Sequence, residues 1–462
     1  MNRGFKIYVA IIGLSVCLLA ACKVSQPYGQ PASVAGDQYR DQQTTDTNTL
    51  ANLPYAELFR DTILQGLIRE GIAENLDLKT AYTRITQFRA YYEQSRAAFY
   101  PTLSANVGAS ENKLTEAQGF GSRSITQFLL GVYSSWEADI WGKLKASRRA
   151  NQAALLQTEA GTRAIQTSIV SAIASNYYQL LALDQQLVIT QHTVEYWDTT
   201  VSVMRALKQA GTVTEAAVVQ SQAQQYAAEV TIPDFKQAIR ETENALSILT
   251  GRAPGAIRRS SLDTQQMPGL LQTGVPAQLL AFRPDVQAAE FAYRNAFELT
   301  NVARTAFYPT LSINGSAGLS SLTIGGLFDV GAIAASIGAG LTQPIFNRRA
   351  LKTNLTVAKA QQDAALYGFR NSLLVASQEV SNAFSLQENA LAKTSVRTNQ
   401  FTALTKSVGY TQELLRNGFA NYTEVITARR SLLAAELGKV DDRLQQLQAT
   451  VNLYRALGGG WK

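Results

Sequence analysis

The chain of 462 residues is 46% hydrophobic and carries a formal net charge of +7, so it has enough apolar residues to bury a large core. No run of basic residues is interleaved with aromatic ones, which excludes a nucleic-acid partner. The mildly basic balance favours no other class of partner.

The first residues are typical of a secretory leader. Arg3 and Lys6 precede an apolar run over residues 7–21, which is too short to span a bilayer as a mature helix. The run ends in Leu-Ala-Ala-Cys, a pattern that resembles a bacterial lipobox, in which cleavage leaves Cys22 as the first residue and the carrier of acyl chains. A plain signal peptide with an incidental cysteine is the alternative. Removal of residues 1–21 changes the formal charge to 42 − 2 − 35 = +5 and, with Cys22 acylated, leaves no thiol for a disulfide.

Residues 22–56 are expected to form a lipidated tether, because Gln, Thr, Ser, Asp and Pro dominate the stretch up to residue 50 without apolar periodicity. Behind the tether the chain is duplicated. The stretch AFYPTLS occurs at residues 98–104 and again at 306–312. This period is too long for a solenoid repeat, so the repeated unit is a whole subdomain. The sequence predicts a first repeat over 57–254, a connector over 255–282 and a second repeat over 283–462.

Most of each repeat has helical periodicity. The longest helix is predicted from about Lys143 to Gln209, where apolar residues recur seven apart in the stripe of a coiled coil. At ~1.5 Å per residue this helix is roughly 100 Å long, so it must pack on other long helices. The stripe comprises Ile173, Leu180, Leu187, Val194 and Val201 in the first repeat and Leu366, Phe369, Leu373, Ala376, Val380 and Ala383 in the second.

The period changes at Pro101 and Pro309. Proline lacks an amide hydrogen and disfavours helix at the preceding residue, so each of the two ends its helix and marks a helix-to-strand corner. Beyond each proline, apolar and small polar residues alternate, which predicts hairpins over about 102–139 and 310–344 with strands of about ten residues. The apolar faces are Leu103, Ala105, Val107 and Ala109 with Phe128, Leu130, Val132, Trp136 and Ala138, and then Leu311, Ile313, Ala317 and Leu319 with Ile333, Ala335, Ile337, Ala339 and Leu341.

Strands of about ten residues are long enough to cross a bilayer when tilted. A sheet in hydrocarbon must close on itself, and four strands cannot close a barrel, since small barrels need about eight. The chain is therefore expected to oligomerise, and a conducting pore favours three or more copies because side chains fill an eight-stranded interior. A soluble four-stranded sheet packed on the helices is the alternative.

Five stretches carry a resemblance to a known family: SSWEADIWGKLKASRRA, LLAFRPDVQAAE, LTQPIFNRRALKTNL, LRNGFANYTEVITARRSLLAAE and VNLYRALGGGW. Together they closely resemble the TolC-like outer membrane factors, in the NodT-type branch of efflux lipoproteins. The resemblance implies a mainly α protein with a membrane β-barrel: a homotrimer with four strands per chain in a twelve-stranded barrel, continued by a long α-helical barrel.

The family resemblance also implies a function and partners. Such proteins are passive exit ducts for drugs or other small molecules, without enzymatic activity or cofactors. Their partners are a periplasmic adaptor, an inner-membrane pump, usually of the resistance-nodulation-division type, and outer membrane lipid. Lys23, next to the lipid cysteine, is not the Asp that commonly retains lipoproteins at the inner membrane, so a lipid-anchored outer membrane protein with a large periplasmic portion is expected.

Two helix turns are expected at the inner tip of the tube, at Gly211 and Gly418. A basic residue precedes each glycine, which suits a left-handed helix cap, and the resemblance makes both glycines candidates for contact with the adaptor. Glu424 stands where the family often has an acidic ring at the closed entrance, whereas Ala217 and Thr427 occupy positions where other acids can occur. The alternative for Glu424 is structural, because Asn421 followed by Glu424 is a capping-box pattern.

Other function classes have weak support. His192 is the only histidine and is expected to be a solvated or helix-seam residue, and no phosphate-binding loop, zinc spacing or nucleophile elbow appears. No catalytic or metal site is predicted. The open alternatives to a drug duct are the outer membrane duct of a type I protein secretion system and a non-conducting, lipid-anchored periplasmic scaffold.

Overall fold

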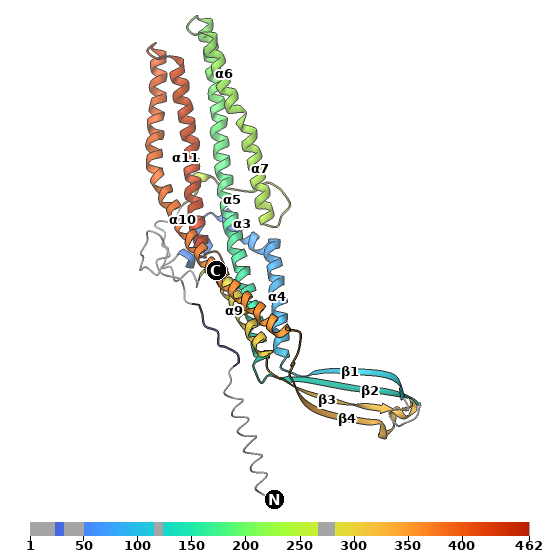
Figure 1. The fold of residues 1–462 in the computed structure, drawn as a ribbon. Coiled ribbons are helices and arrows are strands. Elements are labelled where there is room, and N and C mark those ends of the chain that lie inside the picture. The colour runs from blue at the N-terminus through green and yellow to red at the C-terminus, as the bar shows by residue number, and fades with distance from the viewer. Residues whose placement is uncertain (1–23, 32–49, 115–122, 267–281, 462) are drawn as a thin grey trace. The chain divides into compact units, whose positions relative to one another are not determined.

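The structure is a computed structural model, and it describes residues 24–31, 50–114, 123–266 and 282–461. The chain forms two compact units (Figure 1). Of the described residues, the sheet unit takes in 24–31, 84–114, 123–158 and 288–369, and the helical unit takes in 50–83, 159–266, 282–287 and 370–461. The predicted leader and Cys22 lie outside the described residues. The predicted boundaries of the tether, repeats and connector stay predictions.

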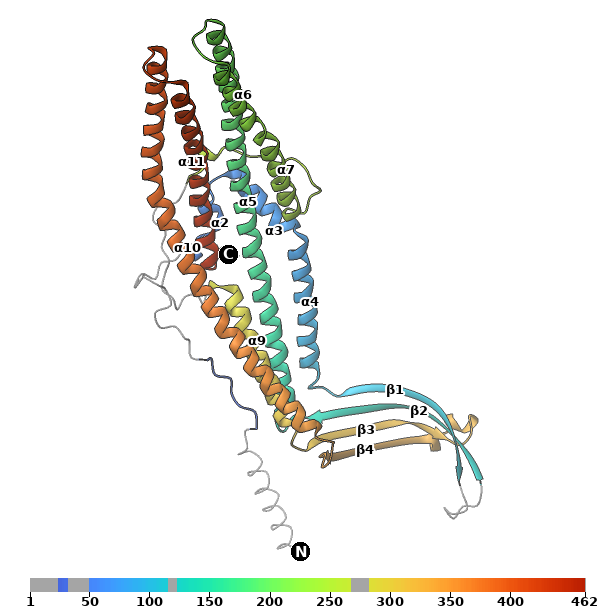
Figure 2. The same ribbon diagram turned by 45° about the horizontal axis from the view of Figure 1, so that its top comes forward.

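The sheet unit contains a four-stranded antiparallel sheet in the order β1-β2-β3-β4 (Figures 1 and 2). Its strands are β1 (Thr102–Leu114), β2 (Arg123–Ala138), β3 (Thr310–Ser321) and β4 (Ile333–Thr342), with the 3-10 turns η5 (Gly325–Phe328) and η6 (Val330–Ala332) between the last two. The four predicted strands are thus confirmed. β1 and β2 are longer than the ten residues predicted, because their ladder continues through the polar stretch Glu111–Lys113.

Helices enter and leave this sheet at equivalent positions of the two repeats. α4 (Leu76–Ala97) and α9 (Pro284–Thr305) precede β1 and β3, whereas α5 (Lys143–Gln209) and α10 (Ala350–Arg416) follow β2 and β4. The bounds of α4 and α9 differ by 208 at both ends, and those of α5 and α10 differ by 207 at both ends. The predicted helix over 143–209 is confirmed.

The helical unit contains the remaining parts of α5 and α10 together with shorter helices. In Figure 2, α6 and α7 run beside α5, and α11 runs beside α10. α11 (Tyr422–Ala456) is continuous, but its counterpart is split into α6 (Glu215–Glu229) and α7 (Thr231–Leu249), because Pro233 has no amide hydrogen to offer the carbonyl of Glu229. The other elements are η1 (Leu50–Asn52), α2 (Tyr55–Leu58), α3 (Thr62–Glu74) and η3 (Leu262–Thr264).

The predicted coiled-coil stripes form much of the core of this unit. Ile173, Leu180 and Val201 are buried in the first repeat. Phe369 at the edge of the sheet unit, and Leu373, Ala376, Val380 and Ala383 of the helical unit, are buried in the second. None of the helices in the described part of the chain has the length and hydropathy that crossing a bilayer requires.

Candidate functional site

The sheet has one apolar and one polar face. Its register places the apolar residues of neighbouring strands opposite one another: Val107 pairs with Leu130, Leu130 with Leu319, and Leu319 with Ile333. Side chains alternate along a strand, so the four predicted apolar stripes share one face. The strand register joins these stripes into one surface. This register could not be predicted from the sequence.

The opposite face carries small polar side chains joined by hydrogen bonds. Ser135 Oγ donates to Asn314 Oδ1 at 2.8 Å, Gln127 Nε2 donates to Ser320 Oγ at 3.0 Å, and Ser316 and Ser336 lie 2.8 Å apart between their hydroxyl oxygens. Close packing between β2 and β3 requires glycine at position 318, because a Cβ there would lie 2.4 Å from the carbonyl oxygen of Leu130. The sheet thus has one face suited to hydrocarbon and one suited to water.

The two outer strands each pair on one side only. β1 pairs with β2 and β4 pairs with β3, so within this described sheet the other edges of β1 and β4 have no hydrogen-bonded neighbour. A long, exposed edge is a template for pairing with another chain. In hydrocarbon an unpaired edge costs several kcal/mol per unsatisfied group, so the sheet is incomplete as a membrane structure.

Pro101 and Pro309 lie at the corners between helix and strand. Each directly precedes its strand, and the residues before it form the same turn in both repeats: Tyr100 N donates to Ala97 O at 2.9 Å, and Tyr308 N donates to Thr305 O at 3.1 Å. A tryptophan secures each corner, since Trp136 Nε1 donates to Phe99 O at 2.9 Å and Trp141 Nε1 donates to Pro309 O at 2.8 Å.

Gly211 and Gly418 end the long helices α5 and α10. Their φ angles are +75° and +76°, a left-handed conformation that glycine adopts without strain. Both turns have the pair of hydrogen bonds of a Schellman motif, from Gly211 N to Lys208 O and Thr212 N to Leu207 O in one, and from Gly418 N to Leu415 O and Phe419 N to Leu414 O in the other. The surroundings of both glycines are open, because a Cβ at either would meet nothing within 4 Å.

Glu424 lies in the first turn of α11, and its side chain is exposed. Its backbone amide donates to the side chain of the N-cap residue Asn421 at 3.1 Å. The structure therefore contains the Asn421 half of the capping-box pattern and leaves the Glu424 carboxylate at the surface.

A buried cluster behind the tips links the two helix pairs. Trp197 and Met204 of α5 and Val218 of α6 pack with Tyr422 and Ile426 of α11. Ser221 and Tyr422 share a hydroxyl hydrogen bond, and burial raises the pKa of Tyr422. This tip cluster was missed from the sequence, because Tyr422 is one aromatic residue in a polar stretch and only the tertiary contact reveals its partner.

A second link between the helix pairs lies on Tyr196 of α5. Gln412 Nε2 of α10 donates to its hydroxyl at 2.9 Å, and the guanidinium of Arg429 of α11 lies 3.8 Å from its ring centroid. Together with the tip cluster, these contacts hold the two tips of one chain against each other.

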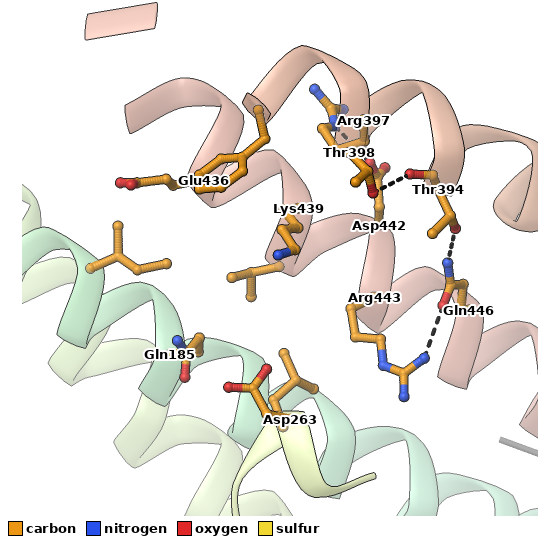
Figure 3. A pocket seen from close by; sticks show the side chains of 14 residues that line it. Gln185, Asp263, Thr394, Arg397, Thr398, Glu436, Lys439, Asp442, Arg443 and Gln446 are labelled. Atoms are coloured by element: carbon orange, nitrogen blue, oxygen red, sulfur yellow. Dashed lines mark hydrogen bonds and ion pairs between the residues drawn. The ribbon is translucent and has the colours of Figure 1, made fainter. Parts of the chain in front are cut away.

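A pocket with a volume of about 450 Å³ lies between α5, η3, α10 and α11 (Figure 3). Arg397 of its wall forms an ion pair with Asp442 at 2.7 Å, and burial raises the pKa of Glu436. Its cations Arg397, Lys439 and Arg443 are matched by the carboxyl groups of Asp263, Glu436 and Asp442. This balance of charge indicates no preference for an anionic or a cationic ligand.

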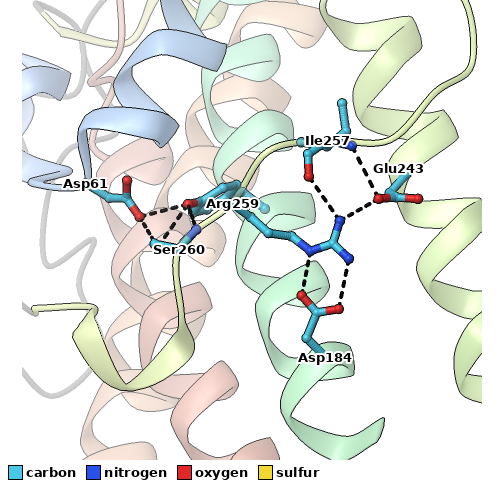
Figure 4. Close-up of polar contacts among 7 residues, drawn as sticks. Asp61, Asp184, Glu243, Ile257, Arg259 and Ser260 are labelled. Atoms are coloured by element: carbon cyan, nitrogen blue, oxygen red, sulfur yellow. Dashed lines mark hydrogen bonds and ion pairs between the residues drawn. The ribbon is translucent and has the colours of Figure 1, made fainter. Parts of the chain in front are cut away.

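The segment that follows α7 clamps the neighbouring helices through Arg259 (Figure 4). Arg259 Nη2 donates to Asp184 Oδ1 of α5 at 2.9 Å, and its Nη1 forms an ion pair with Glu243 of α7. The next residue, Ser260, bonds to Asp61 at the start of α3, and Tyr177 of α5 donates to the same carboxylate at 2.8 Å. Four parts of the helical unit therefore meet at one polar network.

Asp61 makes this network sensitive to acid. Burial acts to raise its pKa, but hydrogen bonds from Ser260, Gln265 and Tyr177 outweigh burial and lower the pKa below its ordinary value of 3.8. A carboxyl group whose pKa is lowered by folding stabilises the fold above its unfolded pKa, and this stabilisation is lost as the pH falls through the folded value.

We therefore expect the unfolding temperature of the wild type to fall between pH 4 and pH 3 more steeply than that of Asp61→Asn. Circular dichroism melts in detergent measure both slopes. The exposed Glu57→Gln variant is the control and should keep the wild-type slope. Equal slopes in the wild type and Asp61→Asn would contradict the assignment.

The structure places His192 at the surface of the helical unit. The side chain of His192 is 73% exposed and lies 3.2 Å from Glu195 Oε2. The described residues contain no cluster of three or more His, Cys, Asp or Glu side chains that could hold a metal ion.

Comparisons with known proteins support a transport role. The family model described as "Outer membrane efflux protein" matches residues 67–252 and 275–459. The chain is 28% identical over 457 residues to the solvent efflux pump outer membrane protein SrpC of Pseudomonas putida, with 97% of each chain covered. It is 26% identical over 452 residues to the cation efflux system protein CusC of Escherichia coli O6:H1, covering 96% of this chain and 97% of that protein.

Solved structures show the same fold. The outer-membrane channel OprN superposes with a TM-score of 0.89 at 23% identity, covering 95% of this chain and 100% of that chain. The open state of the MtrE outer membrane channel of Neisseria gonorrhoeae gives a TM-score of 0.86 at 25% identity, covering 96% and 99%. The match of the family model over both halves shows that this chain belongs to the outer membrane efflux protein family.

Proposed function

We propose that three copies of this chain assemble into one duct whose outer membrane portion is a barrel of twelve strands. The observation that carries the proposal is the incomplete sheet, which has one continuous apolar face and two outer edges that pair with nothing in the described sheet. Closure of the sheet in hydrocarbon requires other copies of the chain. Two copies would give a barrel of eight strands, and side chains fill the interior of such a barrel. Three copies leave a water-filled lumen lined by the polar face.

In this proposal the duct exports small molecules passively. Relatives are named for the efflux of solvents and of cations. For this chain we propose drugs or other small molecules as the exported substrates. Energy comes from an inner-membrane pump, joined to the duct by a periplasmic adaptor. The helices of three copies form the periplasmic tube, and Gly211 and Gly418 lie at its inner end, where the adaptor docks.

The N-terminus supplies a lipid anchor in the proposal, with Cys22 as the acylated residue. The segment directly behind it is seated on α9: Gln26 N donates to Asn301 Oδ1 at 3.1 Å, and Asn301 Nδ2 donates to Gln26 O at 3.0 Å. Because Asn301 belongs to the helix that leads into β3, these bonds support an anchor held near the membrane end of the sheet unit.

The tips act as the gate in this proposal. The tip cluster and the contacts of Tyr196 hold the two helix pairs of one chain together, and three Glu424 carboxylates would surround the entrance. Like charges that converge attract cations, so a Glu424 ring favours cation entry. Opening then requires the contacts around Tyr422 and Tyr196 to break.

Conductance in planar bilayers tests the proposal. We expect the purified wild type to give small or rare channels and Tyr422→Ala to open more often, because the variant removes the buried ring and the bond to Ser221. Tyr410→Ala, which removes an exposed tyrosine of α10, is the matched control and should behave as the wild type. Absence of channels from both the wild type and Tyr422→Ala would contradict the duct.

A further inference from the structure

The duplicated chain has a junction between its two repeats inside the sheet, where β2 of the first pairs with β3 of the second. Around a closed ring of copies, β4 of one copy must meet β1 of the next. In the repeat, β4 is the counterpart of β2 and β1 is the counterpart of β3. We propose that the seam between copies reproduces the β2–β3 junction, with a specific register and a specific corner contact. This inference rests on the proposed ring of copies.

The internal junction has a contact between aromatic side chains at its corner, and the equivalent contact at the seam is missing in a single chain. At the internal junction the rings of Trp141 and Tyr308 lie 5.0 Å apart, and the Trp141 indole bonds to the corner at Pro309. The stretches DIWGK and PIFNR make Phe346 the counterpart of Trp141, and the two YPTLS copies make Tyr100 the counterpart of Tyr308. Tyr100 precedes β1 and Phe346 follows β4, the two outer strands of the sheet, and no ring contact joins the two residues in the described part of the chain.

Exposure supports this assignment. Tyr308 is 38% exposed, whereas its counterpart Tyr100 is 74% exposed and Phe346 is 87% exposed. Large apolar side chains at equivalent positions of two repeats should be buried alike, so the difference indicates the surface that a second copy covers. Phe346 of one copy would then pack on Tyr100 of the next, as Trp141 packs on Tyr308.

The same correspondence fixes the strand register. Ser134 pairs with Gly315 at the internal junction. The equivalence of DIWGK with PIFNR makes Ala339 the counterpart of Ser134, and the equivalence of the two YPTLS copies makes Val107 the counterpart of Gly315. Ala339 of one copy therefore lies opposite Val107 of the next. Both residues belong to the apolar face, so the seam continues that face from one copy to the next without a break.

Strand tilt provides an independent check. Leu103 pairs with Ser134, Ser134 pairs with Gly315, and Gly315 pairs with Ile337. The proposed seam then pairs Ile337 with Ala109 of the next copy, so the register advances by six residues along β1 from one copy to the next. Six residues at about 3.3 Å span about 20 Å, and four strands at about 4.8 Å span about 19 Å, so the strands would tilt by about 45°. Membrane barrels tilt by about 35–45°.

A rival register follows from the hairpins. Leu103 pairs with Ser134 and Leu311 pairs with Leu341, which makes Leu341 rather than Ala339 the counterpart of Ser134. The seam then shifts by two residues, placing Ala339 opposite Ala109. The advance becomes eight residues and the tilt about 54°, which is steeper than membrane barrels adopt.

Paired cysteines distinguish the registers. A disulfide requires Cα atoms about 4.4–6.8 Å apart, so only residues directly opposite each other should link efficiently. The proposed register predicts that Val107→Cys with Ala339→Cys gives covalent trimers on a non-reducing gel after mild oxidation. Ala109→Cys with Ala339→Cys and Ala105→Cys with Ala339→Cys, which test shifts of two residues either way, should give at least several-fold less.

Each outcome decides a separate claim. Preferential linkage of either shifted pair, or no linkage in trimers that remain intact on a native gel, overturns the proposed seam while the duct stands. Absence of trimers in all three proteins and in the wild type overturns the proposed ring itself. Ser134→Cys with Gly315→Cys is the control for oxidation and should link within one chain, because these residues pair at the internal junction.

The corner contact has its own test. Phe346→Ala and Tyr100→Ala should each lower the temperature at which trimers dissociate, and the double variant should lower it by little more than either alone, because both remove one shared contact. Leu322→Ala, which truncates an exposed side chain just beyond β3, is the control and should leave that temperature unchanged. Additive effects of Phe346→Ala and Tyr100→Ala would overturn the contact.

Discussion

Leu130→Arg is expected to abolish insertion of the protein into the outer membrane. Leu130 lies in the middle of β2 on the apolar face, opposite Val107 and Leu319. An arginine facing lipid near the midplane costs about 2–4 kcal/mol in a membrane barrel, and a trimer would carry this cost three times. Membrane fractionation and trimer bands on native gels should show loss of the assembled protein.

Leu129→Arg is the matched control for this prediction. The two leucines are neighbours in sequence, but Leu129 lies on the polar face, opposite Gly108 and Ser320. Its arginine would project into the lumen, where a charge remains hydrated, so trimers should form and only their conductance should change. Equal loss of both variants, or assembly of both, would contradict the assignment of the two faces.

Arg283→Met is expected to destabilise the helical unit by roughly 3 kcal/mol, the lower end of the range for breaking a buried ion pair, because its partners are partly exposed. The Arg283 side chain is 6% exposed and forms ion pairs with Asp285 at 2.6 Å and Glu379 at 2.8 Å. It also donates to the carbonyl oxygen of Ala456 at the end of α11, at 2.8 Å. The substitution leaves these acceptors without the cation that joins α9, α10 and α11.

The loss should appear as a lower urea midpoint in detergent, followed by circular dichroism. Arg455→Met is the matched control, since Arg455 pairs with the same Glu379 at 3.6 Å but its side chain is 44% exposed. An exposed pair contributes about 0–1 kcal/mol, so the control should unfold close to the wild type. A midpoint for Arg283→Met equal to that of Arg455→Met would show that the buried position adds nothing.

The strands and long helices were predictable because their periods are strict. Two patterns depend only on local sequence: the alternation of apolar and polar residues beyond Pro101 and Pro309, and the seven-residue spacing of apolar residues from Ile173 to Val201. The duplication then strengthened each assignment, since every element had to occur twice. The split of α6 from α7 breaks this symmetry, and Pro233 alone accounts for it.

Contacts between distant segments could not be predicted in the same way. In the polar network, the bond from Ser260 to Asp61 joins residues 199 positions apart and the bond from Arg259 to Asp184 joins residues 75 positions apart, and none of these residues belongs to a repeated pattern. Tyr422 likewise gave no signal of its buried bond with Ser221. For Glu424 the sequence left a gate and a cap as alternatives. The structure adds the Asn421 bond without assigning the carboxylate, so the gate stays a proposal.

The central claim is that the sheet of one chain is completed by other copies in lipid. Single-particle cryo-electron microscopy of the full-length protein in lipid nanodiscs tests it most directly. The account predicts three copies around a closed barrel of twelve strands, with the apolar face of β1 to β4 against the lipid. Hairpins lying in water within a single copy would contradict it.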